Sequence, residues 1–140
     1  MAKNLAIVFG IIFVLVGLAG FVGGLGIVGS TGIFETDTVH DLVHIITGVV
    51  LLIVAFAASS SSGLWLKIVG VVYVVVAILG FLLVGSGGAL LGLIHTNSTD
   101  HILHLVLGVV IFLAGMYGGK GSSSMSMPST PSTPSMGGTM

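Results

Sequence analysis

The sequence predicts an all-α integral membrane protein whose four transmembrane helices form two parallel, tandem helical-hairpin repeats. Three observations support this. Of the 140 residues, 55% are hydrophobic and only 5% are charged, whereas a soluble domain carries about 25% charged residues. The apolar residues fall into four long runs, each close to the ~20 residues that cross a bilayer. Finally, the second half of the chain repeats the first at a constant spacing of sixty residues.

Two helices are predicted in the first repeat, which covers about residues 4–58. The first helix, about 5–28, lies within a long stretch that contains no charged residue. It is longer than the ~7–15 apolar residues of a signal peptide, so we expect it to be retained as a membrane span. Thr38 and Asp41 have the spacing of a capping box, which predicts that the second helix begins at residue 37 or 38 and ends near Ala58.

The second repeat covers about residues 64–118. It contains a third helix, about 64–84, and a fourth helix that begins near Ser98 and ends near Tyr117. Residues 1–118 therefore form the predicted transmembrane domain. The remaining segment, 119–140, is rich in Gly, Ser, Pro and Met and is predicted to be disordered, because it cannot bury an apolar core.

The repeat indicates that one helical hairpin has been duplicated. Because each hairpin crosses the membrane twice, both copies enter from the same side, and the loops within the two hairpins share one face. Small residues let membrane helices approach closely, so four glycines are predicted to be packing positions. The four form two repeat-related pairs: Gly20 with Gly80, and Gly48 with Gly108. We expect Gly48 and Gly108, which lie deeper in the membrane, to bring the second and fourth helices together.

Charge predicts the orientation of the protein in the membrane. Lys3, Lys67 and Lys120 fall on the face that carries the termini, and all acids and histidines fall on the other face. The positive-inside rule then places both termini in the cytoplasm of a multi-pass plasma-membrane protein. So few basic residues give no nucleic-acid-binding surface, and the absence of cysteine excludes thiolate metal sites and disulfides.

Six side chains with metal-binding or acid–base chemistry gather at the starts of the second and fourth helices. Residues three or four apart share a helix face, so members of each group are neighbours. In each group the first two residues are one His and one Asp, in opposite order in the two repeats, and the third residue is His in both. The groups are His40, Asp41 and His44 in the first repeat and Asp100, His101 and His104 in the second.

The cluster has three interpretations. In the one we favour, the acids, with Asp37, offset the positive helix N-termini, and His44 and His104 hydrogen-bond across the bundle, so that no cofactor is needed. A second interpretation is a divalent transition-metal site, because imidazole and carboxylate suit Zn, Cu or Ni. A third is haem, with His44 and His104 as facing axial ligands, or a proton relay. No activated serine nucleophile is evident, so we expect no enzymatic activity.

These paired motifs resemble an uncharacterised family of small four-helix membrane proteins of bacteria and archaea, domain of unknown function 4383. The matching residues are Gly20-Phe21, the segment 41–48 and the segment 101–108, within a resemblance that covers about residues 4–118. The resemblance implies a four-helix membrane fold and no particular reaction. The common histidines, His44 and His104, carry over from the family pattern.

Taken together, the sequence favours a small non-enzymatic structural or accessory membrane protein. The lipid bilayer is its expected partner, with a homo-oligomer or another membrane protein associating through the glycine-rich faces. A metal- or haem-binding protein that uses the His/Asp cluster is the alternative. A channel or transporter has little support, because four helices with few intramembrane polar groups leave little to line a pathway.

Overall fold

The computed structural model describes residues 1–23 and 26–119. Within these residues the chain forms four helices that are long and apolar enough to cross a membrane. The predicted tail lies outside the described residues except for Gly119. The helices are α1 (Ala2–Val22), α2 (Thr38–Ala57), α3 (Ser62–Leu83) and α4 (Ser98–Gly118), with a single 3₁₀ turn, η2 (Ser59–Ser61), between α2 and α3.

Only the end of α1 departs substantially from the predicted bounds. The helix stops at Val22, six residues before the predicted end, because Gly23 adopts a left-handed conformation with φ of 73°. Its N–H bonds back to the carbonyls of Ala19 and Gly20, which is a usual way for a helix to end at glycine. The apolar run therefore continues past the helix, and hydrophobicity alone overestimated its length.

Short strands, which the sequence did not predict, occupy both loops at one end of the bundle. A parallel pair links β1 (Val28–Gly29) to β2 (Phe34–Glu35). An antiparallel hairpin joins β3 (Gly87–Leu90) to β4 (Ile94–Asn97). Pairing satisfies backbone N–H and C=O groups that would be costly to leave unbonded near a membrane.

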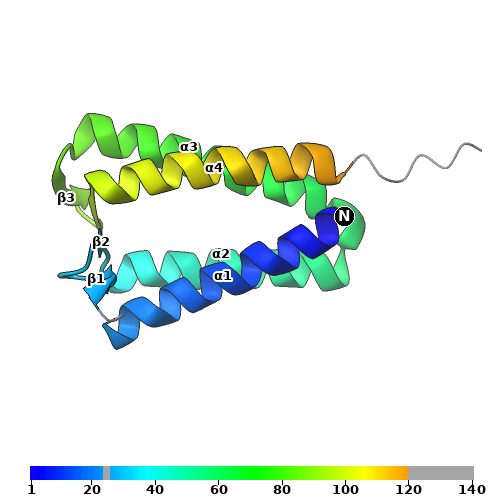
Figure 1. Ribbon diagram of the computed structural model, residues 1–140, viewed down its shortest axis with the longest axis horizontal. Helices are drawn as coiled ribbons and strands as arrows, with labels where there is room; N and C mark the ends of the chain where they lie inside the picture. The colour runs from blue at the N-terminus through cyan, green and yellow to red at the C-terminus, as the bar shows by residue number, and fades with distance from the viewer. Residues whose placement is uncertain (24–25, 120–140) are drawn as a thin grey trace, which may run out of the picture.

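The four helices are arranged as two antiparallel hairpins that lie side by side (Figure 1). The N-terminus and the α2–α3 connection lie at one end, and the strands lie at the other. Lys3 and Lys67 belong to the first of these ends, where the Lys3 ammonium lies 5.7 Å from the centre of the Phe56 ring. The described Asp, Glu and His side chains belong to the strand end.

Glycine allows the two helices of each hairpin to pack closely. A Cβ atom placed on Gly48 of α2 would lie 2.6 Å from the carbonyl oxygen of Gly10 in α1. A Cβ atom placed on Gly108 of α4 would lie 2.8 Å from the carbonyl oxygen of Gly70 in α3. Our expectation that Gly48 and Gly108 bring α2 and α4 together is therefore wrong. Both glycines are used inside their own hairpin, where the helix backbones come closest.

Larger side chains fill the space between the hairpins, and they occur at positions sixty residues apart. The rings of Phe13 in α1 and Tyr73 in α3 lie 5.1 Å apart between centroids and are both buried. Leu51 in α2 and Ile111 in α4 are fully buried in the same core. The glycine seams therefore hold each hairpin together, and an apolar core joins the two hairpins.

The glycine seam gives a direct stability prediction. We expect Gly48→Ala to lower the free energy of unfolding by about 1–3 kcal/mol, because the added methyl group forces the α1 and α2 backbones apart. Thermal unfolding in detergent, followed by helical circular dichroism, measures the effect. Gly87→Ala is the control, since a Cβ atom there would meet its nearest neighbour at 3.8 Å. Equal melting temperatures for the two variants would contradict the prediction.

Candidate metal centre

Caps at the helix starts fix the orientation of the first turns of α2 and α4. The Asp37 carboxylate accepts a hydrogen bond of 2.8 Å from the His40 backbone N–H, so Asp37 is the N-cap of α2. The capping box predicted at Thr38 is wrong. At the equivalent place in α4, Asn97 is the N-cap and forms a capping box with Asp100. The caps explain much of the acidic character of this end without any ligand.

Hydrogen bonds in both directions connect the loop of each hairpin to the N-terminus of the second helix of the other hairpin. The backbone N–H of His95 donates to the Asp37 carboxylate at 2.9 Å, and the His95 ring contacts the same oxygen at 2.9 Å. In the opposite direction, the backbone N–H of Glu35 donates to the Asp100 carboxylate at 3.0 Å. Burial alone would raise the pKa of Asp37, but the N–H groups of His40 and His95 and the His95 ring lower it to about 2.

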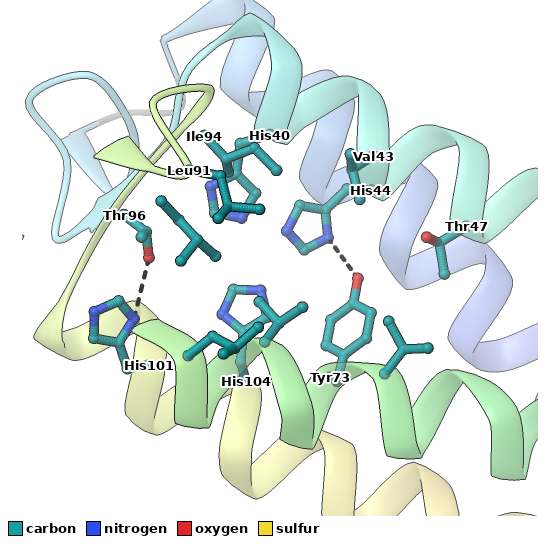
Figure 2. A pocket seen from close by; sticks show the side chains of 14 residues that line it. His40, Val43, His44, Thr47, Tyr73, Leu91, Ile94, Thr96, His101 and His104 are labelled. Atoms are coloured by element: carbon teal, nitrogen blue, oxygen red, sulfur yellow. Dashed lines mark hydrogen bonds between the residues drawn. The ribbon is translucent and has the colours of Figure 1, made fainter. Parts of the chain in front are cut away.

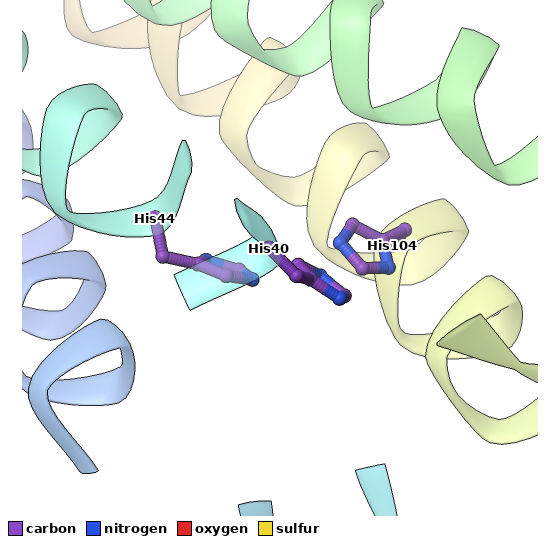
Figure 3. A group of neighbouring side chains, drawn as sticks. All are labelled: His40, His44 and His104. Carbon is purple, nitrogen blue, oxygen red and sulfur yellow. The ribbon is translucent and has the colours of Figure 1, made fainter. Parts of the chain in front are cut away.

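Three histidines meet between the hairpins, directly beneath these caps. His40 and His44 come from successive turns of α2, and His104 comes from α4 (Figure 3). Each offers a ring nitrogen such that the three nitrogens lie within 4.8 Å of one another. These residues are 4%, 7% and 7% exposed, respectively. The ring centroids are 5.0 Å apart for His40 and His44, 5.5 Å for His40 and His104, and 5.9 Å for His44 and His104. We call these three residues the histidine trio.

Each ring of the histidine trio is held through its Nδ1 atom. Nδ1 of His40 donates to the backbone carbonyl of His95 at 2.9 Å, and Nδ1 of His104 donates to the carbonyl of Asp100 at 2.6 Å. For His44 the partner is the hydroxyl of Tyr73, at 3.4 Å. A carbonyl can only accept, so the hydrogen is on Nδ1 in His40 and His104, and a neutral ring keeps its lone pair on Nε2.

In His40 and His104 the Nε2 atoms are therefore the nitrogens left for a ligand. No hydrogen bond to them is found among residues 1–23 and 26–119. Metal-binding histidines almost always have this arrangement, in which one ring nitrogen donates to a carbonyl or other acceptor and the other binds the ion. Metal–nitrogen distances of 2.0–2.1 Å place tetrahedral ligands about 3.3 Å apart. The three nitrogens, which lie within 4.8 Å of one another, would have to move closer together to reach that spacing.

A cavity of about 210 Å³ opens next to the histidine trio (Figure 2). Apart from histidine, its polar lining comes from Thr47, Tyr73 and Thr96, and the remaining walls are Val, Leu and Ile side chains. No Asp, Glu, Lys or Arg of the described chain lines it. Among the described residues, four histidines line the cavity, the histidine trio and His101. Three grouped histidines beside an open space match a metal site that keeps a coordination position free for water or another ligand.

The other three predicted residues are not members of the histidine trio, although His101 lines the same cavity (Figure 2). Asp41 packs against Gly20 of α1, where a Cβ atom would collide with its carboxyl group. His101 occupies the equivalent place against Gly80 of α3, with its Nδ1 atom 3.4 Å from the Thr96 hydroxyl. Asp100 binds backbone N–H groups in the capping box. The structure thus brings together His40, His44 and His104, and it places Asp41, Asp100 and His101 in packing and capping roles.

Sequence reasoning missed Tyr73 and the carbonyl of His95. Tyr73 aligns with Phe13 in the repeat, so a hydroxyl present in only one copy was an available signal. The use of a backbone carbonyl could not be foreseen, because it depends on the fold of the β3–β4 hairpin and not on the type of residue 95.

Haem does not fit this arrangement. The His40 ring stacks against both His44 and His104, so it occupies the flank where a porphyrin held between those two axial ligands would extend. A single ion fits the donor set, and a macrocycle does not.

Comparison with known proteins gives a family and no function. No curated protein and no solved structure matches the chain. One family matches residues 3–117, which is most of the chain, and it is described as a domain of unknown function (DUF4383). The resemblance noted in the paired motifs is thereby confirmed, and the protein belongs to this family.

Proposed function

We propose that this protein binds a divalent transition-metal ion, Zn²⁺ in the first place, through His40, His44 and His104. One observation carries the proposal: three buried imidazoles converge from two hairpins, and carbonyl acceptors on Nδ1 of His40 and His104 leave the Nε2 lone pairs of these two rings available. Neutral imidazole is a preferred ligand for Zn²⁺, Cu²⁺ and Ni²⁺.

This proposal revises the function favoured by the sequence, a structural or accessory subunit without a cofactor. Helix capping accounts for Asp37 and Asp100, but it leaves the histidine trio unexplained. Association with a partner through glycine-rich faces also loses support, because Gly48 and Gly108 already pack against α1 and α3. A homo-oligomer or another membrane partner would have to use the apolar outer faces of the helices.

We further propose that the four helices cross the plasma membrane as two copies of one duplicated hairpin. The paired burial of Phe13 with Tyr73 and of Leu51 with Ile111 supports duplication. Lys3 and Lys67, at the opposite end from the histidine trio, support cytoplasmic termini through the positive-inside rule. In this orientation the metal centre lies near the outer surface of the membrane.

Metal analysis of the detergent-purified protein tests the proposed function. The parent is expected to bind one Zn²⁺ per chain after dialysis, and His44→Leu and His104→Leu are expected to lose it, because two imidazoles do not complete the site. His101→Leu is the matched control: His101 is also buried on α4 but lies outside the histidine trio. It should retain the metal.

Co²⁺ substituted for Zn²⁺ provides a second readout, since intense visible bands accompany tetrahedral coordination. A parent that binds no stoichiometric metal would overturn the proposal. So would equal metal loss in His101→Leu and His104→Leu, because that result would attribute binding to folding and not to these ligands.

A further inference from the structure

We infer that the metal centre receives the carboxylate of a long-chain fatty acid, whose alkyl chain lies in the apolar seam between α2 and α3. This inference rests on the proposed function, because the bound ion supplies the positive charge for the carboxylate. Three features of the structure support it: the shape of the seam, the charge at its outer end and its access to lipid.

The seam is formed by two adjoining cavities. The first, of about 210 Å³, contacts the histidine trio, and a second of about 210 Å³ continues along α2 and α3 as far as Trp65. Both are lined by Thr47, Val72 and Tyr73, so they meet at that level. Eight residues of helix separate Tyr73 from Trp65, which corresponds to roughly 12 Å along the axis. The combined space is extended along the two helices, as an alkyl chain lying parallel to them would be.

Charge is confined to one end of this space. A divalent ion on three neutral imidazoles leaves two positive charges beside walls of Val, Leu and Ile, and no acidic side chain of the described chain lines either cavity. Asp41 and Asp100 line neither cavity: Asp41 packs on Gly20, and Asp100 accepts backbone N–H groups. An anionic oxygen ligand is strongly favoured at such a centre, and the hydroxyl of Tyr73 lies close enough to His44 to be a further polar neighbour.

The seam opens towards the outer face of the bundle. Val43 of α2 is 41% exposed and Val72 of α3 is 50% exposed, although both line the cavity beside the histidine trio. In a membrane these faces meet lipid, so a molecule dissolved in the bilayer reaches the ion without crossing water. A water-soluble anion has no alkyl chain to pack against the apolar walls of the seam. The pairing of a metal-bound anionic head with an apolar channel selects a lipophilic carboxylate.

Trp65 is the single tryptophan of the chain and lies at the far end of the seam, so its fluorescence reports on an occupant. Stearic acid brominated at the middle of its chain should quench Trp65 in the Zn²⁺-loaded protein, saturating at one molecule per chain. Quenching should weaken at least tenfold in apparent affinity for the mid-chain-brominated alcohol of equal length, which lacks the negative charge. It should also weaken at least tenfold when the protein is stripped of metal.

Val72→Phe, which fills the level where the two cavities meet, should abolish saturable quenching and retain Zn²⁺. Val71→Phe is its matched control, because Val71 is equally exposed, at 49%, but lines neither of the two cavities. Equal quenching by acid and alcohol, or by the metal-free protein, would overturn the inference while stoichiometric Zn²⁺ left the proposed function intact. A protein that binds no Zn²⁺ would overturn both.

Discussion

Zn²⁺ at a hundred times its dissociation constant is expected to stabilise the parent protein against unfolding by about 2.7 kcal/mol. The physical reason is that the ion links the two helical hairpins. His40 and His44 belong to the first hairpin and His104 to the second, so unfolding that separates the hairpins must release the metal. The measurement is thermal unfolding in detergent with and without Zn²⁺, followed by circular dichroism.

The increment caused by Zn²⁺ within each variant is the quantity to compare, because the substitutions also change stability by themselves. His104→Leu removes the only ligand contributed by the second hairpin, and we expect its increment to vanish. His101→Leu should keep the increment of the parent. An increment in His104→Leu as large as that of the parent would show that Zn²⁺ stabilises the protein through some other site.

Tyr73→Phe is expected to lower the affinity for Zn²⁺ by about 10- to 100-fold, which is the usual effect of removing a group that orients a metal-binding histidine. Its hydroxyl is the partner of His44 Nδ1 at 3.4 Å. The ring itself packs against Phe13, and phenylalanine preserves that contact. The loss should therefore appear in metal affinity, measured by competition with a chelator of known strength, and not in the fold.

Thr96→Val is the matched control for this experiment. It also removes one hydroxyl that lies 3.4 Å from Nδ1 of a buried histidine, but that histidine is His101, which is outside the histidine trio. We expect Zn²⁺ affinity within about twofold of the parent, since the group that orients His44 is untouched. Equal effects of Tyr73→Phe and Thr96→Val would mean that neither hydroxyl acts through a metal ligand.

The sequence predicted the helices well because hydrophobic length is a local property. The start of α4 at Ser98 followed from the polar segment before it, and the bounds of α2 and α3 were within two residues. Errors arose where a single backbone conformation decides the outcome. The left-handed Gly23 ends α1 early, and no hydrophobicity pattern distinguishes that glycine from its neighbours.

The candidate site was predicted as a region and not as a set of ligands. Helical spacing places His40 and His44 on one face, but it places Asp41 near that face as well. The choice between them depends on the close approach of α1 to α2, where the missing side chain of Gly20 makes room for Asp41. In the second hairpin Gly80 makes the same room for His101. Contacts between helices therefore decided which residues reach the centre.

The two hairpins differ at the first position of the cluster, where one has His40 and the other has Asp100, and this difference breaks their twofold symmetry. Two identical hairpins related by a twofold axis present every side chain twice, so they can bring together two or four histidines at the axis but never three. A group of three requires the halves to differ at one position. His40 in one half and Asp100 in the other provide that difference. A single chain can encode such an odd number of ligands, whereas a dimer of one hairpin cannot.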